Sequence, residues 1–417
     1  MQLTDQEKGI LDGKHGEGAR ITLSILVDLG ELFGAGEMME VSQVHIDSSI
    51  YFVDAGLEFA ERLAELGAKV TVPTSLNPSA IDLERWKEYR VPPELLEKSR
   101  RMERAYLNMG ATPTWTCAPY QGGMIPRFGE QIAWGESNAI AFANSIIGAR
   151  TNRYADLMDV CASLVGKVPR FGLHLPENRR AEVLIRLIGV THEMFKDQAI
   201  YPLLGLLVGE MAGDRVVAIE GIPQNAGIDS LKGFSAAVAS SGAVGLFHLV
   251  GMTPEAQTIE MCLQGTRPKE VLEISPTMIR KAEQGLWTTK GDIVDLVAIG
   301  CPHFSFMEFR ELAERINGKK VHSSIVFWVF TSRTIHGWIK NCGILKGLID
   351  SGIMVFTDAC VLRYPKETWH FNVMMTNSAK LANYCYSQTG LDVAYGSLEE
   401  CVNTAVRGRI CRRKSLW

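Results

Sequence analysis

The sequence predicts an α/β protein of several lobes, built on mostly parallel sheets that helices cover. Two observations carry this prediction. The 417-residue chain is too long for one simple core. Its second half alternates short, continuously apolar runs with segments of helical spacing. Strands that are apolar on both faces and separated by helices are typical of parallel, helix-covered sheets.

The composition is that of an ordinary globular protein, with 46% apolar residues, 22% charged residues and a net charge of -4. A mildly acidic chain is not expected to bind nucleic acid or lipid headgroups. The first twenty residues are polar, unlike a secretory signal, and no apolar run reaches the roughly 20 residues that span a bilayer. We therefore expect a cytoplasmic protein whose nine cysteines are thiols or metal ligands.

The first half is predicted to combine helices with short strands. Residues 39–51 and 68–80 contain strand-like runs that end in polar loops. Helical spacing is found in stretches that glycines interrupt or end, because glycine commonly closes a helix. The first stretch, residues 1–35, is broken at Gly13 and Gly16. The other three are residues 56–67, 93–109 and 129–147, which end at Gly67, Gly110 and Gly148 respectively.

The second half contains four apolar runs that we predict to be strands, within residues 242–256, 295–305, 323–333 and 352–361. No Pro/Ser-rich linker separates the halves. We place the boundary between an N-terminal part, 1–225, which carries substrate-site loops, and a C-terminal lobe of repeated strand–helix units, 226–417.

Three polar segments that follow predicted strands or extended runs carry a cysteine: Cys117, Cys301 and Cys360. Ligands gather at the carboxyl ends of parallel strands, so these thiols are candidates for one crevice. Three converging thiolates suit an iron–sulfur cluster. With three protein ligands, a four-iron cluster would leave one iron open to act as a Lewis acid on a hydroxyl. The alternative is that each is a small core residue, as we expect for most of the other cysteines.

A second polar segment, residues 134–153, places Ser137 and Asn138 on a predicted helix and Asn152 and Arg153 in the loop after it. Arginine forks suit a carboxylate or phosphate. Cations favoured by the helix dipole explain the same pattern equally well.

A third segment, residues 376–390, combines Ser378, Lys380 and Tyr384, with the last two at i and i+4 of a predicted helix. Any dehydration needs an acid–base group beside the substrate carboxylate, and this segment offers candidates. A solvated helix start is the alternative. His45, in a predicted loop, and Asn77, after a predicted strand, are further candidates for substrate binding, although a lone histidine is more often structural.

Five motifs in this order, TCAPY, WGESNAIAFANSIIGARTNR, GLFHLVGMTPEA, AIGCPH and FTDAC, resemble the large, catalytic subunit of the aconitase X family over most of the chain. The resemblance implies an aconitase-like, multi-lobed α/β fold and hydro-lyase activity. It also implies an iron–sulfur cluster, of the 2Fe-2S, 3Fe-4S or 4Fe-4S type. By motif matching, Cys117, Cys301 and Cys360 are the predicted cluster ligands.

The same resemblance assigns Ser137, Asn138, Asn152 and Arg153 to the substrate site. In the expected reaction, Arg153 holds the substrate carboxylate, Ser378 or Lys380 removes the α-proton, and the cluster takes the departing hydroxide. We expect Ser137 to join them as a catalytic residue.

The resemblance also implies the substrate and a partner. We expect cis-3-hydroxy-L-proline to be converted to Δ1-pyrroline-2-carboxylate, with (R)-5-phosphomevalonate as the alternative substrate. A non-catalytic sensor on an aconitase scaffold is the alternative of another class. Family members carry a small swivelling domain, fused or as a separate subunit, and we expect a separate small subunit here.

Overall fold

The computed structural model describes residues 1–154, 156–363, 368–413 and 415–417. Within these residues the strands form four sheets, and all but the two-stranded one are parallel throughout. This arrangement confirms the predicted α/β class with mostly parallel sheets. No helix in the described ranges is both long enough and apolar enough to cross a membrane.

The N-terminal lobe is built around a three-stranded parallel sheet of order β3-β2-β4 and a two-stranded antiparallel sheet of β1 and β5. Glycines and a proline end or start its helices as the sequence predicts. Positive φ at Gly13 and Gly16 separates the first two helices. Helix α4 begins at Pro93 and is capped by Gly110. The elements are α1 (Asp5–Leu11), α2 (Glu17–Leu32), β1 (Met38–Glu40), β2 (Val44–Ile46), α3 (Asp54–Glu65), β3 (Thr74–Leu76), α4 (Pro93–Met109), β4 (Ala133–Trp134), α5 (Ser137–Phe142), α6 (Met158–Val165) and β5 (Lys167–Pro169), with short 3₁₀ turns between some of them.

The helix predicted over 129–147 is shorter than expected. Residues 133–134 form strand β4, which pairs with β2, and the helix begins only after Glu136. The Glu136 carboxylate accepts a hydrogen bond from the N–H of Asn138 and so caps the helix. The last turn, Ala143–Ile147, is a π-helix that ends at Gly148 as predicted.

A four-stranded parallel sheet of order β8-β7-β6-β9 forms the second lobe. The predicted boundary between residues 225 and 226 lies inside this sheet, because β7 and β8 on either side of it pair with each other. Strand β8 therefore joins the second lobe and not the C-terminal one. The elements are β6 (Val183–Leu187), α7 (Ile200–Ala212), β7 (Val217–Glu220), α8 (Ile228–Ser241), β8 (Phe247–Leu249), α9 (Ile259–Cys262), β9 (Glu270–Ile274) and α10 (Pro276–Gly285).

The C-terminal lobe contains a five-stranded parallel sheet of order β12-β11-β10-β13-β14. The chain builds outward from β10 in one direction and then returns to its other side, so the strand order reverses between β10 and β13. A crevice opens at the carboxyl ends of the strands at such a reversal, and ligands bind there in open α/β sheets. The elements are β10 (Leu296–Ile299), α11 (Phe306–Ile316), β11 (Val326–Thr331), α12 (Arg333–Asn341), α13 (Ile344–Asp350), β12 (Ile353–Thr357), β13 (Val373–Thr376), α14 (Ala379–Thr389), β14 (Asp392–Tyr395) and α15 (Leu398–Arg407).

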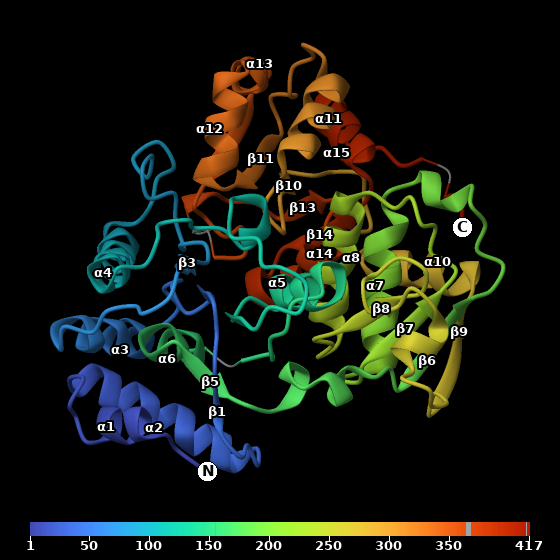
Figure 1. Cartoon of the computed structure of the whole chain (residues 1–417). Coiled ribbons are helices and arrows are strands. Elements are labelled where there is room, and N and C mark those ends of the chain that lie inside the picture. Colours follow the sequence, from blue (N-terminus) through green and yellow to red (C-terminus); the bar gives the residue numbers. More distant parts are fainter. Residues whose placement is uncertain (155, 364–367, 414) are drawn as a thin grey trace.

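The three lobes meet near the middle of the molecule, where α5, α8 and α14 lie close together (Figure 1). Helix α8 of the second lobe contacts both α5 of the first lobe and α14 of the third. A short parallel bridge also joins the loop after β3 to the loop after β12, at Ser79 and Ala359. These contacts bring polar loops of the first and third lobes to one place.

Candidate active site

The three predicted cysteines lie on loops that the fold brings together. Cys301 follows β10 and Cys360 follows β12, at the carboxyl ends of the five-stranded sheet. Cys117 lies in the loop after α4, and its sulfur accepts a hydrogen bond from the backbone N–H of His303 at 3.3 Å. The N–H of Cys360 donates to the carbonyl of Ser79 at 3.0 Å, which ties the β12 loop to the N-terminal lobe.

Burial and nearby charges both shift the pKa of the three thiols. Burial is the main cause that raises the pKa of all three thiols, and it raises the pKa of Cys360 to about 12. The charge on Cys301 raises the pKa of Cys117 and of Cys360 further, while the Lys380 ammonium lowers the pKa of all three. Cys117 and Cys360 thus both lie within electrostatic range of Cys301, and Lys380 lies within range of all three thiols.

The chemistry of this donor set fits an iron–sulfur cluster better than a single ion. In the described ranges, no three His, Cys, Asp or Glu side chains are placed to hold one metal ion. A single ion needs ligand atoms about 2.0–2.3 Å from one point. In a cluster the thiolates bind different irons and lie farther apart. Three half-buried thiols near one cation, on loops from two lobes, meet that requirement.

A buried ion pair lies beside the thiols. The Lys380 Nζ is 2.6 Å from Glu136 Oε1, and both side chains are about nine-tenths buried. Burial disfavours the charge on Glu136, but Lys380 and the hydrogen bonds from Lys380 and Asn138 hold the pKa of that carboxyl well below its usual range. Burial likewise disfavours the Lys380 ammonium, yet Glu136 raises the pKa of Lys380 above its usual value. Both groups are therefore charged at neutral pH.

Asn77 connects this pair to a second carboxyl group. Its Nδ2 donates to Glu136 Oε2 at 3.1 Å and also to Asp47 Oδ1. Burial, followed by the charges of Glu136, Asp156 and Asp159, raises the pKa of Asp47 well above the usual range. Two carboxyl groups bridged by one amide thus differ in their affinity for a proton, which is the usual sign of acid–base partners.

His45 lies inside strand β2 and not in the loop that the sequence predicted. It is fully buried, its Nδ1 is 2.8 Å from Ser75 Oγ, and its Nε2 is 3.3 Å from Asn77 Oδ1. Because an amide oxygen only accepts, the proton is assigned to Nε2, and burial lowers the pKa of His45 to about 4. His45 therefore holds Asn77 in place.

The other candidates on α5 and α14 also lie at the site. Ser137 Oγ is 3.3 Å from Glu136 Oε1, and Asn138 Nδ2 donates to the same oxygen at 2.6 Å. The Oδ1 of Asn138 is buried and has no partner among the described residues. Ser378 caps α14 by accepting from the N–H of Leu381 at 3.0 Å, and its hydroxyl donates to the carbonyl of Cys301. Both bonding positions of Ser378 are thus used for structure.

Asn152 and Arg153 line a different cavity, together with apolar residues of α2 and the loop at 171–173. The Asn152 amide is engaged with backbone groups, since Nδ2 donates to Phe171 O at 3.1 Å and Oδ1 accepts from Leu173 N at 2.7 Å. Arg153 is exposed and donates to the carbonyl of Gly242 at 3.2 Å. Glu136 nevertheless acts on the pKa of Arg153, so this arginine lies at the edge of the site.

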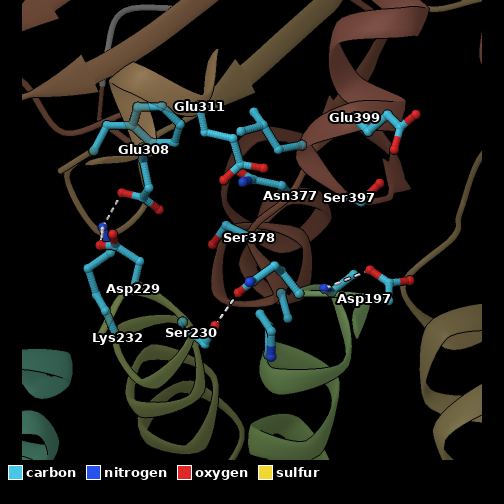
Figure 2. A pocket seen from close by; sticks show the side chains of 18 of the residues that line it. Asp197, Asp229, Ser230, Lys232, Glu308, Glu311, Asn377, Ser378, Ser397 and Glu399 are labelled. Atoms are coloured by element: carbon cyan, nitrogen blue, oxygen red, sulfur yellow. Dashed lines mark hydrogen bonds and ion pairs between the residues drawn. The ribbon is translucent and has the colours of Figure 1, made fainter. Parts of the chain in front are cut away.

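A polar cavity of about 170 Å³ is lined in part by the Cys301 loop, at the crevice between β10 and β13. Figure 2 shows Asn377 and Ser378 in the middle of this group, with Asp229, Lys232 and Glu308 on one side and Ser397 and Glu399 on the other. Lys232 bonds to both acidic neighbours of α8 and α11.

Sequence reasoning did not assign roles to Glu136 and Asp47. Glu136 is one of several polar residues in the segment 134–153, and nothing in the sequence separates it from the others. Asp47 lies in a segment that was considered only because of His45. The position of Glu136 directly before a helix carried little signal, because Ser, Thr, Asp and Asn are the preferred caps and glutamate is not among them. Its pairing with Lys380, 244 residues away in the chain, carried no local signal.

Comparison with known proteins places these features in a family. Sequence models of the aconitase X first, second and third domains match residues 1–177, 181–284 and 294–407. A cis-3-hydroxy-L-proline dehydratase from Pseudomonas aeruginosa is 41% identical over 97% of this chain and 70% of its own length. A phosphomevalonate dehydratase large subunit from Methanocaldococcus jannaschii is 36% identical over 96% of this chain and 99% of its own length.

The solved structure of the holo-form of aconitase X from Thermococcus kodakaraensis is also similar. It superposes with a TM-score of 0.88 at 32% identity, covering 97% of this chain and 100% of that one. This likeness confirms the aconitase-like fold. The three domain models and the near full-length relatives show that the chain belongs to the aconitase X family.

Proposed function

We propose that the chain is a dehydratase that removes water from a small hydroxy acid, with cis-3-hydroxy-L-proline as the substrate. The observation that carries this proposal is the buried Lys380–Glu136 pair, which lies in electrostatic range of all three thiols. The relative from Pseudomonas aeruginosa, which is named for this substrate, supports the choice.

In this reaction Lys380 acts as a fixed positive charge. Negative charge builds on the substrate carboxylate as the α-proton leaves, and a preorganised cation stabilises it in a site shielded from water. Lys380 is ion-paired and charged, so it does not serve as the base that the sequence analysis considered. Glu136 keeps the ammonium in place, with hydrogen bonds from Asn77 and Asn138 satisfying its oxygens.

We assign proton transfer to the Asp47 carboxyl group. Its raised pKa makes its ionised form a stronger base than an ordinary aspartate, and it stands beside the charged pair. Ser378, the other base considered, uses its hydroxyl to cap α14 and to bond the Cys301 carbonyl. Its contacts support a structural role at the cysteine loop.

Cys117, Cys301 and Cys360 are the residues that would hold the cluster. When bound, the cluster supplies a Lewis acid for the hydroxyl that leaves. The chain's own residues orient the substrate so that this hydroxyl faces the thiols and its carboxylate faces Lys380. Loss of the α-proton and of hydroxide then forms the C=C bond, and the resulting enamine tautomerises to Δ1-pyrroline-2-carboxylate.

Phosphomevalonate is the second candidate, since several relatives of nearly the same length carry that name. The charges at the site favour the amino acid. Asp47, Glu136 and Asp156 lie close enough to influence one another's pKa, and Lys380 is already paired. A secondary ammonium is attracted to such a group, and a phosphate, which carries more negative charge than a carboxylate, is repelled more strongly than the carboxylate of the amino acid.

A partner belongs to the proposal. Relatives named large subunits imply a small subunit, and we propose that this chain works with one. The test is to produce the full chain anaerobically with and without a small aconitase X subunit from the same source. Both substrates are then assayed, and iron and sulfide are counted.

Turnover of cis-3-hydroxy-L-proline, lost in Asp47→Asn and in Cys301→Ser, is the expected result. Turnover of phosphomevalonate alone would replace the substrate assignment. A brown, iron-loaded complex that dehydrates neither compound would favour the sensor alternative.

A further inference from the structure

His303 lies where the three cysteine segments meet. It follows Cys301 by two residues, its backbone N–H donates to Cys117 Sγ at 3.3 Å, and its Nε2 lies 3.0 Å from the carbonyl of Ala359, next to Cys360. One residue thus contacts all three segments. Its own carbonyl accepts from Lys232 Nζ at 3.1 Å, which anchors it to α8 of the second lobe.

The contacts define the state of the ring. A carbonyl oxygen only accepts, so Nε2 carries the proton in its bond to Ala359. The side chain is buried, with 2% of its surface exposed. The ring is therefore a directional donor from the Cys301 loop to the Cys360 loop.

A second histidine offers a chemically matched comparison. His248 in β8 also bonds a backbone carbonyl through Nε2, that of Arg179 at 2.7 Å, and is also buried. In both rings Nδ1 is buried and lacks a hydrogen-bond partner within the described part of the chain. An unpaired Nδ1 therefore does not set His303 apart from His248. His303 differs because it contacts all three cysteine segments.

We propose that His303 is a positioning residue that sets the spacing of Cys117, Cys301 and Cys360 for the cluster. The inference rests on the proposed iron–sulfur function. Hydrogen bonds to cluster sulfurs and to the loops that carry them tune such centres, and loss of such outer partners typically costs about 10–100-fold in metal affinity.

The test compares two polar replacements. Glutamine places its amide N–H₂ near the position of Nε2 and keeps the bond to Ala359, whereas the shorter asparagine places it near Nδ1 and loses that bond. We expect His303→Asn to lower iron affinity about 10-fold and His303→Gln to stay within about twofold of the native chain. His248→Asn is the matched control and should keep native iron affinity.

Two readouts are measured, neither of which is turnover. Iron and sulfide are titrated into the full chain anaerobically, and the alkylation rate of each thiol is followed by mass spectrometry in the iron-free chain. We expect Cys117 and Cys360 to be alkylated faster in His303→Asn than in His303→Gln. Equal iron affinity and equal alkylation in both variants would overturn the proposal. If the native chain bound no iron, the cluster would be refuted, and the alkylation rates would still decide whether His303 positions the thiols.

Discussion

At the scale of single residues, the site depends on charges that neutralise one another away from water. Lys380 and Glu136 are both about nine-tenths buried and 2.6 Å apart. A buried charge that loses its partner is strongly unfavourable, while removal of both charges together is much less so. In the proposed reaction, the pair therefore contributes both to stability and to catalysis.

Lys380→Met is expected to abolish turnover and to lower the free energy of unfolding by about 3–5 kcal/mol, because Glu136 is left charged and buried. The double variant Lys380→Met/Glu136→Gln should recover most of that stability but not the activity. Thermal and urea unfolding of the iron-free chain measure the first effect. Lys346→Met, which removes an exposed pair with Asp350, is the control and should change stability by less than about 1 kcal/mol. Additive losses in the double variant would show that the two charges are not coupled.

At the scale of elements, α7 and α8 of the second lobe pack with their backbones close together. A Cβ placed on Gly205 would lie 2.5 Å from the carbonyl oxygen of Phe234, and one on Gly209 would lie 2.6 Å from that of Val238. Both neighbours are backbone atoms of α8, so they cannot rotate away. This close contact holds α8, which in turn contacts α5 and α14 at the site.

Gly205→Ala is expected to destabilise the chain by about 1–3 kcal/mol through overpacking, although alanine favours a helix over glycine by about 1 kcal/mol. Gly347→Ala is the matched control. Gly347 lies in α13 with open space around its Cβ position, so the change should raise stability slightly. Unfolding midpoints of both variants measure the difference, and a stabilised Gly205→Ala would mean that α7 and α8 can move apart.

At the scale of the whole molecule, buried neutral histidines make stability depend on pH. Burial lowers the pKa of His45 to about 4 and that of His174 to about 3. His174 is held between Tyr154 and Gln131. In the unfolded chain these rings titrate near 6.5, so below that pH the unfolded state binds more protons than the folded state. Stability from these rings is complete above about pH 6.5 and is lost as the pH falls toward 4.

The expected slope is up to about 1.4 kcal/mol per pH unit for each such ring. His174→Gln removes one titrating group and should flatten the loss of stability between pH 6.5 and 4. Unfolding midpoints of the native and variant chains at several pH values test this. His15→Gln, a change on the exposed surface, serves as the control. An unchanged slope in His174→Gln would show that this ring already binds its proton in the folded state.

The elements that sequence predicted well are those with strong local signals. Pro93 and Gly110 set the ends of α4, and glycine closed several other helices as expected. Cys301 and Cys360 could be proposed as site residues because a polar end after an apolar run is a local pattern. Strands β13 and β14 were not predicted, because their continuous apolar runs, residues 373–375 and 393–395, are only three residues long. The hydrogen-bond partners of Lys380 and Asn77 could not be predicted from the sequence, because contacts between distant segments produce no periodic pattern of residues.

The bridge between Ser79 and Ala359 limits how this protein can be divided. It puts Cys360 on backbone that is paired with a loop from the opposite end of the chain. A fragment that begins at residue 181 would leave that loop edge unpaired. A fragment that ends at residue 177 would retain only Cys117 of the three proposed cluster ligands. Split halves should therefore recover iron binding only when mixed, so fragment complementation would report directly on how the two ends of the chain are joined.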